Sequence, residues 1–137
     1  MVMSELETTR RPRVPPHNLE AEESLLGAML LSRDAIADAV ELTQTEHFYR
    51  PAHAHVFDAI STLYAAGDPA DPVTVAEELD RAGVLTTIGG LDGLLNLQGN
   101  TPATSNASKY AQIISERYTL RRLIEGSGEI AEIGFST

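Results

Sequence analysis

The chain has 137 residues, 42% of them apolar and 22% charged, which are the proportions of one ordinary globular domain. Ten basic against twenty acidic residues give a net charge of −10, and a surface this acidic repels phosphate, so direct binding of nucleic acid by this chain is disfavoured. The absence of cysteine excludes disulfides and thiolate metal sites, and the longest apolar run, residues 25–31, is too short to cross a membrane, so we expect a cytoplasmic protein.

The chain begins with residues 1–16, which carry mixed charges and have no apolar periodicity. This segment ends in Val14-Pro15-Pro16 and predicts a flexible leader ahead of one domain that spans residues 17–137. The first helix is expected over residues 19–31, because Asn18 can cap it and the acidic residues of its first turn suit the helix dipole. Its apolar face holds Leu19, Leu26, Met29 and Leu30.

Two more helices are expected before residue 67. Ser32 or Asp34 can cap a short helix that ends before Thr45 and has the apolar positions Ile36, Ala39, Val40 and Leu42. Pro51 suits the first turn of the next helix, and Gly67 ends it. That helix has the clearest amphipathic pattern of the chain, with one face that holds Val56, Phe57, Ile60, Leu63 and Tyr64.

A turn is predicted at residues 68–72, which contain two prolines. After it, Thr74 and Glu77 match a capping box at the start of a helix, Glu77 can pair with Arg81 one turn later, and Gly83 ends the helix. Gly89-Gly90 then leads into a short leucine-rich helix that contains Leu91, Leu94, Leu95 and Leu97.

A long helix is expected from about residue 106 to residue 135, after a loop over residues 99–106. If it is continuous, Leu123 and Ile130 project from one side, and another side carries Tyr110, Ile113, Ile114, Leu120, Ile124, Ala131 and Phe135. A second apolar stripe predicts a second surface to pack against. Gly126 and Gly128 either break the helix or let another helix come close, and the sequence leaves both alternatives open. Since no segment alternates apolar and polar residues, the domain is expected to be all-α.

The residues that could carry chemistry form no catalytic pattern. The single lysine, Lys109, stands outside any glycine-rich phosphate loop, so this sequence lacks the nucleotide site of an ATP-driven motor. His53 and His55 lie two residues apart on a helix and point about 200° away from each other, so they cannot chelate one metal ion. We expect a buried or half-buried His53 that bonds locally. The alternative is a small helical enzyme with a site around His53.

A small basic patch stands out on this acidic chain, formed by Arg117, Arg121 and Arg122. It is either a solvated face paired with Glu116 and Glu125 or a docking point for an acidic partner. A DNA-binding helical domain is a further hypothesis, and the net charge argues against it.

Several short segments occur in an order and spacing that resemble the N-terminal domain of a bacterial replicative DNA helicase of the DnaB type. They are Leu19-Glu20-Ala21-Glu22, Leu26-Gly27-Ala28-Met29-Leu30, Phe48 to His53, Asp71-Pro72-Val73-Thr74, Gly89-Gly90, Asn106, Tyr110-Ala111 and Arg121-Arg122-Leu123-Ile124. The similarity runs from about Pro15 to Phe135. One departure is Gly93, which cannot supply the aromatic contact of the tyrosine that the family commonly places near this position.

The resemblance implies a small globular bundle of short helices, followed by a long helix that is the first arm of a helical hairpin. It implies a non-catalytic domain through which subunits pair, the pair being the unit of a hexamer, and on which the C-terminal domain of primase docks. A helicase loader is a further expected partner. No cofactor is expected here, since ATP and Mg²⁺ would belong to a motor domain outside this sequence. By position, the residues facing primase would be Glu20, Arg121, Ile124 and Ile130, and those used in self-association would be Leu120, Leu123 and Phe135.

Overall fold

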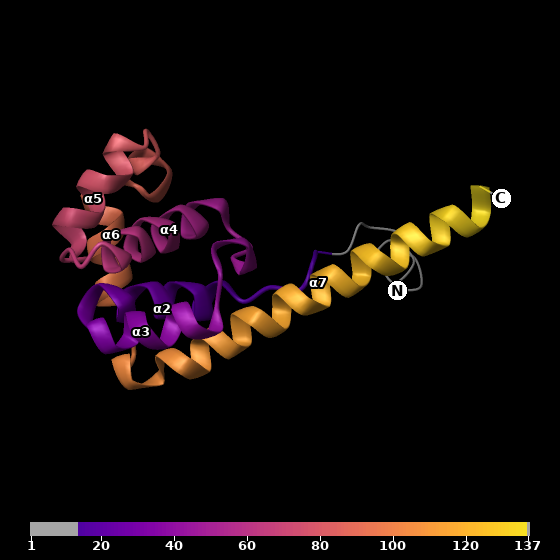
Figure 1. Cartoon of the computed structure of the whole chain (residues 1–137), viewed down its shortest axis with the longest axis horizontal. Helices are drawn as coiled ribbons and strands as arrows, with labels where there is room; N and C mark the ends of the chain where they lie inside the picture. Colours follow the sequence, from indigo (N-terminus) through magenta and orange to yellow (C-terminus); the bar gives the residue numbers. More distant parts are fainter. Residues whose placement is uncertain (1–13, 137) are drawn as a thin grey trace, which may run out of the picture.

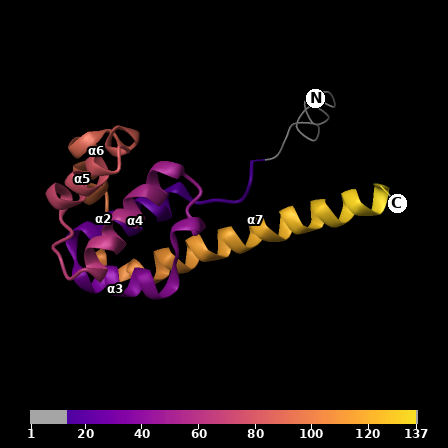
Figure 2. The ribbon, with the colours of Figure 1, turned by 45° about the horizontal axis from the view of Figure 1, so that its top comes forward.

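The protein consists of a helical head and one long helix that projects from it, as Figures 1 and 2 show. The computed structural model describes residues 14–136, with side chains described for residues 14–127. The α-helices are α2 (Leu19–Leu31), α3 (Arg33–Leu42), α4 (Pro51–Ala65), α5 (Pro72–Arg81), α6 (Gly90–Gly99) and α7 (Ala107–Ser136). Three short 3₁₀ turns connect them: η1 (Thr45–His47), η2 (Leu85–Ile88) and η3 (Thr104–Asn106). Within residues 14–136 there is no strand, and the all-α prediction is confirmed.

Helix α2 is the centre of the head, because it packs against α3, α4, α6 and α7. Leu25, Leu26 and Met29 are buried in its middle. The core around them is almost entirely aliphatic and includes Ile36, Val56, Ile60, Val75, Leu79, Leu94 and Ile114. Helices α5 and α6 lie on the far side of the head from α7 (Figures 1 and 2). One helix surrounded by four others explains why α2 carries apolar residues on every side.

The crossing of α2 and α6 is very close. A Cβ atom added at Gly27 would collide with the side-chain oxygen of Thr101 and with the backbone carbonyl of Leu97. The Thr101 hydroxyl lies 3.2 Å from the Ser24 carbonyl oxygen of α2 and 3.3 Å from the Leu97 carbonyl oxygen of α6, within hydrogen-bonding distance of both helices. Only glycine therefore lets the end of α6 lie directly on α2.

The helix ends follow local signals, and most of the predicted ones are confirmed. Asn18 accepts a hydrogen bond from the Ala21 amide at 3.0 Å and starts α2, and Ser32 caps α3. Gly67 and Gly83 have φ angles of 77° and 76°, left-handed values that glycine adopts without steric cost just after a helix.

The predicted capping box at Thr74 is wrong. Helix α5 begins earlier, at Pro72, and Asp71 is its N-cap, with its carboxylate 2.9 Å from the Thr74 amide. Proline fits the first helical position because its missing amide has no intrahelical acceptor there. Thr74 instead lies in the first turn, where its hydroxyl bonds back to Asp71. The expected pair of Glu77 with Arg81 is present on the surface at 3.8 Å.

The long last helix is continuous through Gly126, so the alternative of a break there is wrong. Nothing described lies within 4 Å of a Cβ added at Gly126, so the structure shows no close neighbour for it either. The predicted apolar side of α7 divides in two. Tyr110, Ile113 and Ile114 face the head, whereas Leu120 and Ile124 are exposed, because α7 has begun to leave the head by then. The side chains of Ile130, Ala131 and Phe135 lie outside the described residues.

A few other apolar positions expected in the core are exposed. Val40 and Leu42 of α3 and Leu91 and Leu95 of α6 all lie on the surface, because each of these short helices packs through one narrow face. The end of the predicted leader, by contrast, is held. Pro16, the last residue of that segment, accepts a hydrogen bond from Arg121 of α7 at 2.8 Å.

Candidate docking surface on the last helix

The first part of α7 is fixed firmly to the head. Ala107, Ala111 and Ile114 are buried, and two side chains reach across to backbone carbonyls. The Thr43 hydroxyl donates to the Ala111 carbonyl at 3.2 Å, and the Ser115 hydroxyl donates to the Leu42 carbonyl at 2.8 Å. The N-terminal third of α7 is therefore a structural part of the head.

The next turns of α7 carry an exposed apolar surface. Leu120 is 45% exposed, Leu123 61% and Ile124 59%. Residues at i, i+3 and i+4 lie on one side of a helix, so the three side chains form one continuous strip, called here the arm ridge. Water contact with three aliphatic side chains is unfavourable by about 1 kcal/mol or more for each, so burial of the ridge would stabilise a complex.

Two hollows adjoin the arm ridge. One has a volume of about 490 Å³ and is lined by Val14, Pro15, Pro16, Arg121, Ile124 and Glu125. The other has a volume of about 420 Å³ and is lined by Ser115, Glu116, Arg117, Thr119 and Leu120. The exposed pair of Arg122 with Glu125, at 3.6 Å, lies beside the ridge. An apolar strip with charged residues at its edge is the usual composition of a protein interface.

Arg121 differs from its neighbours because it is turned toward the head. Its guanidinium donates to the Pro16 carbonyl at 2.8 Å and to the His47 carbonyl at 2.7 Å. It also lies over the rings of Tyr49 and Tyr118, 5.5 and 5.7 Å from their centroids. These contacts to the head were not predicted, and contact of Arg121 with a partner stays a prediction.

The histidines near Arg121 complete this cluster. His17 stacks on Tyr49 with ring centroids 4.1 Å apart, and His47 packs against Tyr118 at 4.5 Å. Partial burial holds the pKa of His47 below its usual value, and Arg121 also lowers it, while Glu46 acts in the opposite direction. His17 and His47 had no predicted role, since sequence spacing does not reveal ring stacking between distant segments.

The remaining predicted partner residue with a described side chain, Glu20, is exposed in the first turn of α2. Ile124 is exposed as well and belongs to the arm ridge together with Leu120 and Leu123. Ile130 and Phe135 were predicted for the same surfaces, and their side chains lie outside the described residues.

A buried ionisable pair, Glu22 and His53, lies inside the head. Their side chains meet at 2.8 Å and are each about 1% exposed. An ionised Glu22 can only accept, so His53 Nδ1 carries the proton between them, and Glu22 also accepts from the amides of Tyr49 and Arg50 at 2.8 and 3.4 Å. The expected burial of His53 is confirmed, but its partner is not local, because Glu22 lies 31 residues earlier in the chain, on α2.

Burial of both side chains leaves the alternative of an enzyme around His53 without support, because a solute cannot reach them unless the head opens. The role of Glu22 was missed, although a signal existed. With 100° per residue, Glu22 falls among Leu19, Leu26 and Met29 on the apolar face of α2.

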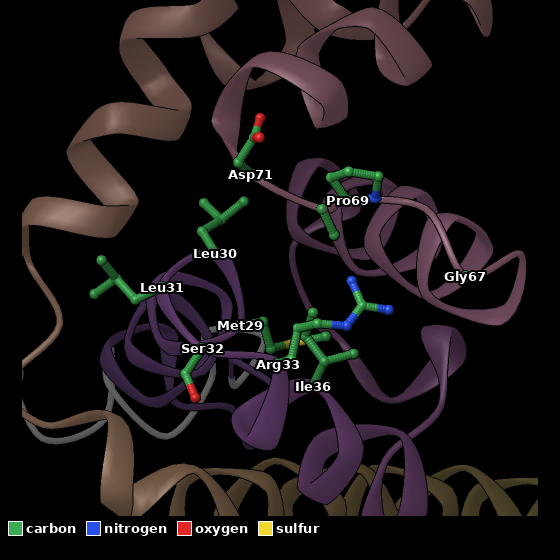
Figure 3. A pocket seen from close by; sticks show the side chains of 10 residues that line it. Met29, Leu30, Leu31, Ser32, Arg33, Ile36, Gly67, Pro69 and Asp71 are labelled. Atoms are coloured by element: carbon green, nitrogen blue, oxygen red, sulfur yellow. The ribbon is translucent and has the colours of Figure 1, made fainter.

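A hollow in the head lies between the start of α3 and the loop from α4 to α5 (Figure 3). Its volume is about 470 Å³, and Met29, Leu30, Leu31, Ser32, Arg33, Ile36, Gly67, Pro69, Ala70 and Asp71 line it. Its charged side chains already have structural partners. Arg33 donates to the Asp68 carbonyl at 2.9 Å and covers the Tyr64 ring, and Asp71 caps α5. The hollow therefore has no pair of residues arranged for acid–base chemistry.

Two further observations limit the chemistry of the described residues. Among residues 14–127 no three histidine or acidic side chains are arranged to hold a metal ion. In the same part of the chain no helix is long and apolar enough to span a membrane.

Comparison with known proteins identifies the family of this chain. Residues 14–116 match the family described as "DnaB-like helicase N terminal domain". The chain therefore belongs to the DnaB-like N-terminal domain family. It is 51% identical over 124 residues to the replicative DNA helicase DnaB of Mycobacterium leprae, and this match covers 90% of the chain and 20% of the helicase. With DnaB of Leifsonia xyli the identity is 46%, and the match covers 90% of the chain and 27% of the relative.

Two solved structures share the fold of this DnaB-like domain. The crystal structure of the N-terminal domain of DnaB helicase from Mycobacterium tuberculosis superimposes with a TM-score of 0.86 at 51% identity, covering 89% of this chain and 88% of that one. The corresponding domain from Helicobacter pylori gives a TM-score of 0.73 at 17% identity, covering 85% and 90%. The latter structure was described together with its interactions with primase.

Proposed function

We propose that this DnaB-like domain is a non-catalytic assembly module, through which the subunits of a replicative helicase pair and primase is recruited. The chain spans about a fifth to a quarter of the length of the curated relatives it matches, so the activity of the whole protein is part of this proposal. ATP hydrolysis and unwinding would belong to the remaining part of the parent, because this sequence has no phosphate-binding loop.

The observation that carries the proposal is the arm ridge. Leu120, Leu123 and Ile124 are exposed on α7, the helix that projects from the head (Figure 1). A helix with an uncovered apolar strip is suited to packing against another helix. Leu120 and Leu123 are assigned to subunit pairing, and Ile124 and Glu20 to contact with the C-terminal domain of primase.

Charge supports protein partners over nucleic acid. The net charge of −10 opposes binding to a phosphate backbone, whereas a basic partner surface would be attracted to it. Charged residues around an interface mainly raise the rate of association, and the apolar arm ridge would supply most of the binding affinity.

Pairing can be tested by placing a charge on the ridge. The Leu123→Asp variant should weaken self-association at least about tenfold, since loss of one buried leucine costs roughly 1.5–3 kcal/mol and a buried carboxylate costs more. Sedimentation equilibrium of this chain and of the full-length parent helicase measures the effect. Leu95→Asp is the matched control, because Leu95 is 45% exposed on the head, away from the ridge.

Primase docking has a separate test. The C-terminal domain of the cognate primase is titrated by calorimetry into the wild type, an Ile124→Asp variant and the Leu95→Asp control. Weaker binding to Ile124→Asp alone supports the assignment. Equal binding to all three would remove Ile124 from the primase surface, and no binding to the full-length parent would remove primase docking from the proposal.

A further inference from the structure

Arg121 joins three segments that are far apart in the sequence. Its two terminal nitrogens donate to the carbonyls of Pro16, before α2, and His47, in η1. Its central carbon, Cζ, lies over the rings of Tyr49 and Tyr118, 5.5 and 5.7 Å from their centroids. Together these five residues are called here the Arg121 junction. It ties the segment before α2 and the segment before α4 to the middle of α7.

The geometry of the junction needs an arginine. The guanidinium is planar, carries several N–H donors in fixed directions and stacks on aromatic rings, whereas the ammonium of lysine is a compact point charge. A lysine at this position could keep the positive charge but could not donate to both carbonyls with the directed geometry of a guanidinium while remaining beside the two tyrosine rings. Both acceptors are neutral backbone carbonyls, so the contact depends on shape and direction more than on charge pairing.

The position of the junction along α7 gives it mechanical importance. Before it, α7 is anchored through Ala111, Ile114 and Ser115. After it, the side chains of Arg122 to Glu125 are exposed. With a rise of about 1.5 Å per residue, the helix extends roughly 22 Å from Arg121 to Ser136. A small change of direction at Arg121 therefore becomes a large displacement at the end of the helix.

We propose that Arg121 is a positioning residue that fixes the direction in which α7 leaves the head, and with it the orientation of the arm ridge. The importance for assembly rests on the proposed function, since an interface that must close in a ring requires each subunit to present its ridge at one angle. The direction of the helix itself is a property of the single chain and does not depend on any partner.

The competing explanation is that the buried residues Ala107, Ala111 and Ile114 determine the direction of α7 by themselves. In that case, removing the Arg121 contacts would leave the helix where it is. The two explanations differ most beyond Ser115, where the described contacts to the head come from Tyr118 and Arg121.

A distance measurement between two spin labels separates these explanations. Because the chain has no cysteine, Asp58→Cys on α4 and Ser127→Cys on α7 provide unique labelling sites, and both positions are exposed. The distance distribution is measured by pulsed electron resonance, at concentrations where light scattering gives a monomer. Circular dichroism establishes that each variant is folded.

We expect Arg121→Gln and Arg121→Lys both to broaden or shift the distribution, by about 5 Å for a swing of roughly 15° over the ~18 Å from Ser115 to Ser127. The control Arg122→Gln removes an exposed cation one residue away and should leave the distribution unchanged. An unchanged distribution in Arg121→Gln overturns the proposal, and so does full recovery by Arg121→Lys, because charge alone would then suffice. Failure of ridge pairing in the tests above would leave this measurement unaffected.

Discussion

Replacing Glu22 with alanine tests how much the buried Glu22–His53 pair contributes to the stability of the head. Glu22 is about 1% exposed and accepts hydrogen bonds from His53 Nδ1 at 2.8 Å, the Tyr49 amide at 2.8 Å and the Arg50 amide at 3.4 Å. Alanine removes all three acceptor contacts and leaves a void beside His53.

The expected loss follows from the groups left without a partner. A buried donor that loses its acceptor costs about 1–3 kcal/mol, and His53 receives this penalty in full because it is also about 1% exposed. The Tyr49 and Arg50 amides lie nearer the surface, where water replaces part of the lost bond, and together contribute roughly 1 kcal/mol. The free energy of unfolding should therefore fall by about 3 kcal/mol.

Urea unfolding followed by circular dichroism suits this all-helical chain, which has no tryptophan for fluorescence. A loss of about 3 kcal/mol corresponds to a fall of roughly 12 °C in Tm for a domain of this size. Glu22→Gln should be milder, because an amide oxygen can still accept from the Tyr49 amide and the side chain still fills the space beside His53. The matched control is Glu20→Ala, an exposed acid on the same helix, which should cost at most about 0.5–1 kcal/mol.

A Glu22→Ala variant as stable as Glu20→Ala would refute the reasoning. It would mean that the buried pair contributes no more than a surface acid. A double variant adds a second criterion. Removing both Glu22 and His53 should cost less than the sum of the two single losses by about 1 kcal/mol or more, since neither partner is then left without a bond.

Three other predictions follow from packing, capping and protonation. Gly27→Ala should destabilise the head by about 2 kcal/mol or more in urea unfolding, because its Cβ meets a backbone carbonyl, while Gly126→Ala should stabilise α7 by up to ~1 kcal/mol because the space is open. Asp71→Ala should lower the free energy of unfolding by about 1 kcal/mol and Thr74→Ala should lower it clearly less, because Asp71 is the N-cap of α5. The reverse order would support a capping box at Thr74. The lowered pKa of His47 means that the unfolded chain binds its proton more readily. Its contribution to stability is therefore complete above pH 6.5 and is lost as the pH falls through the lower folded value, and a His47→Gln variant should lack this part of the pH dependence.

The helix boundaries could be predicted because their signals are local. Asn18, Pro51, Gly67 and Gly83 each act through their own backbone conformation or through a neighbour within three residues. The same local signals failed at Thr74, where a capping-box pattern competed with an aspartate followed by proline, and the structure uses the latter.

The candidate site was only partly visible in the sequence. The sequence placed Leu120 and Ile124 on one apolar stripe of the last helix and Leu123 on another, whereas all three are exposed and adjoin one another in the single arm ridge. The inward orientation of Arg121 could not be predicted, because its acceptors are backbone carbonyls about 75 and 105 residues earlier in the chain. Every residue has a backbone carbonyl, so a contact with one cannot be recognised from the types of residues in the sequence.

The central position of α2 has a consequence for synthesis on the ribosome. This helix is made first among those described, yet two of its neighbours, α6 and α7, are made last. At translation rates of about 5–20 residues per second, roughly 4–17 s pass between completion of α2 and the emergence of Ile114. During that interval α3 and α4 become available to α2, but its apolar faces that pack on α6 and α7 remain exposed to water and offer a binding surface to chaperones at the exit tunnel.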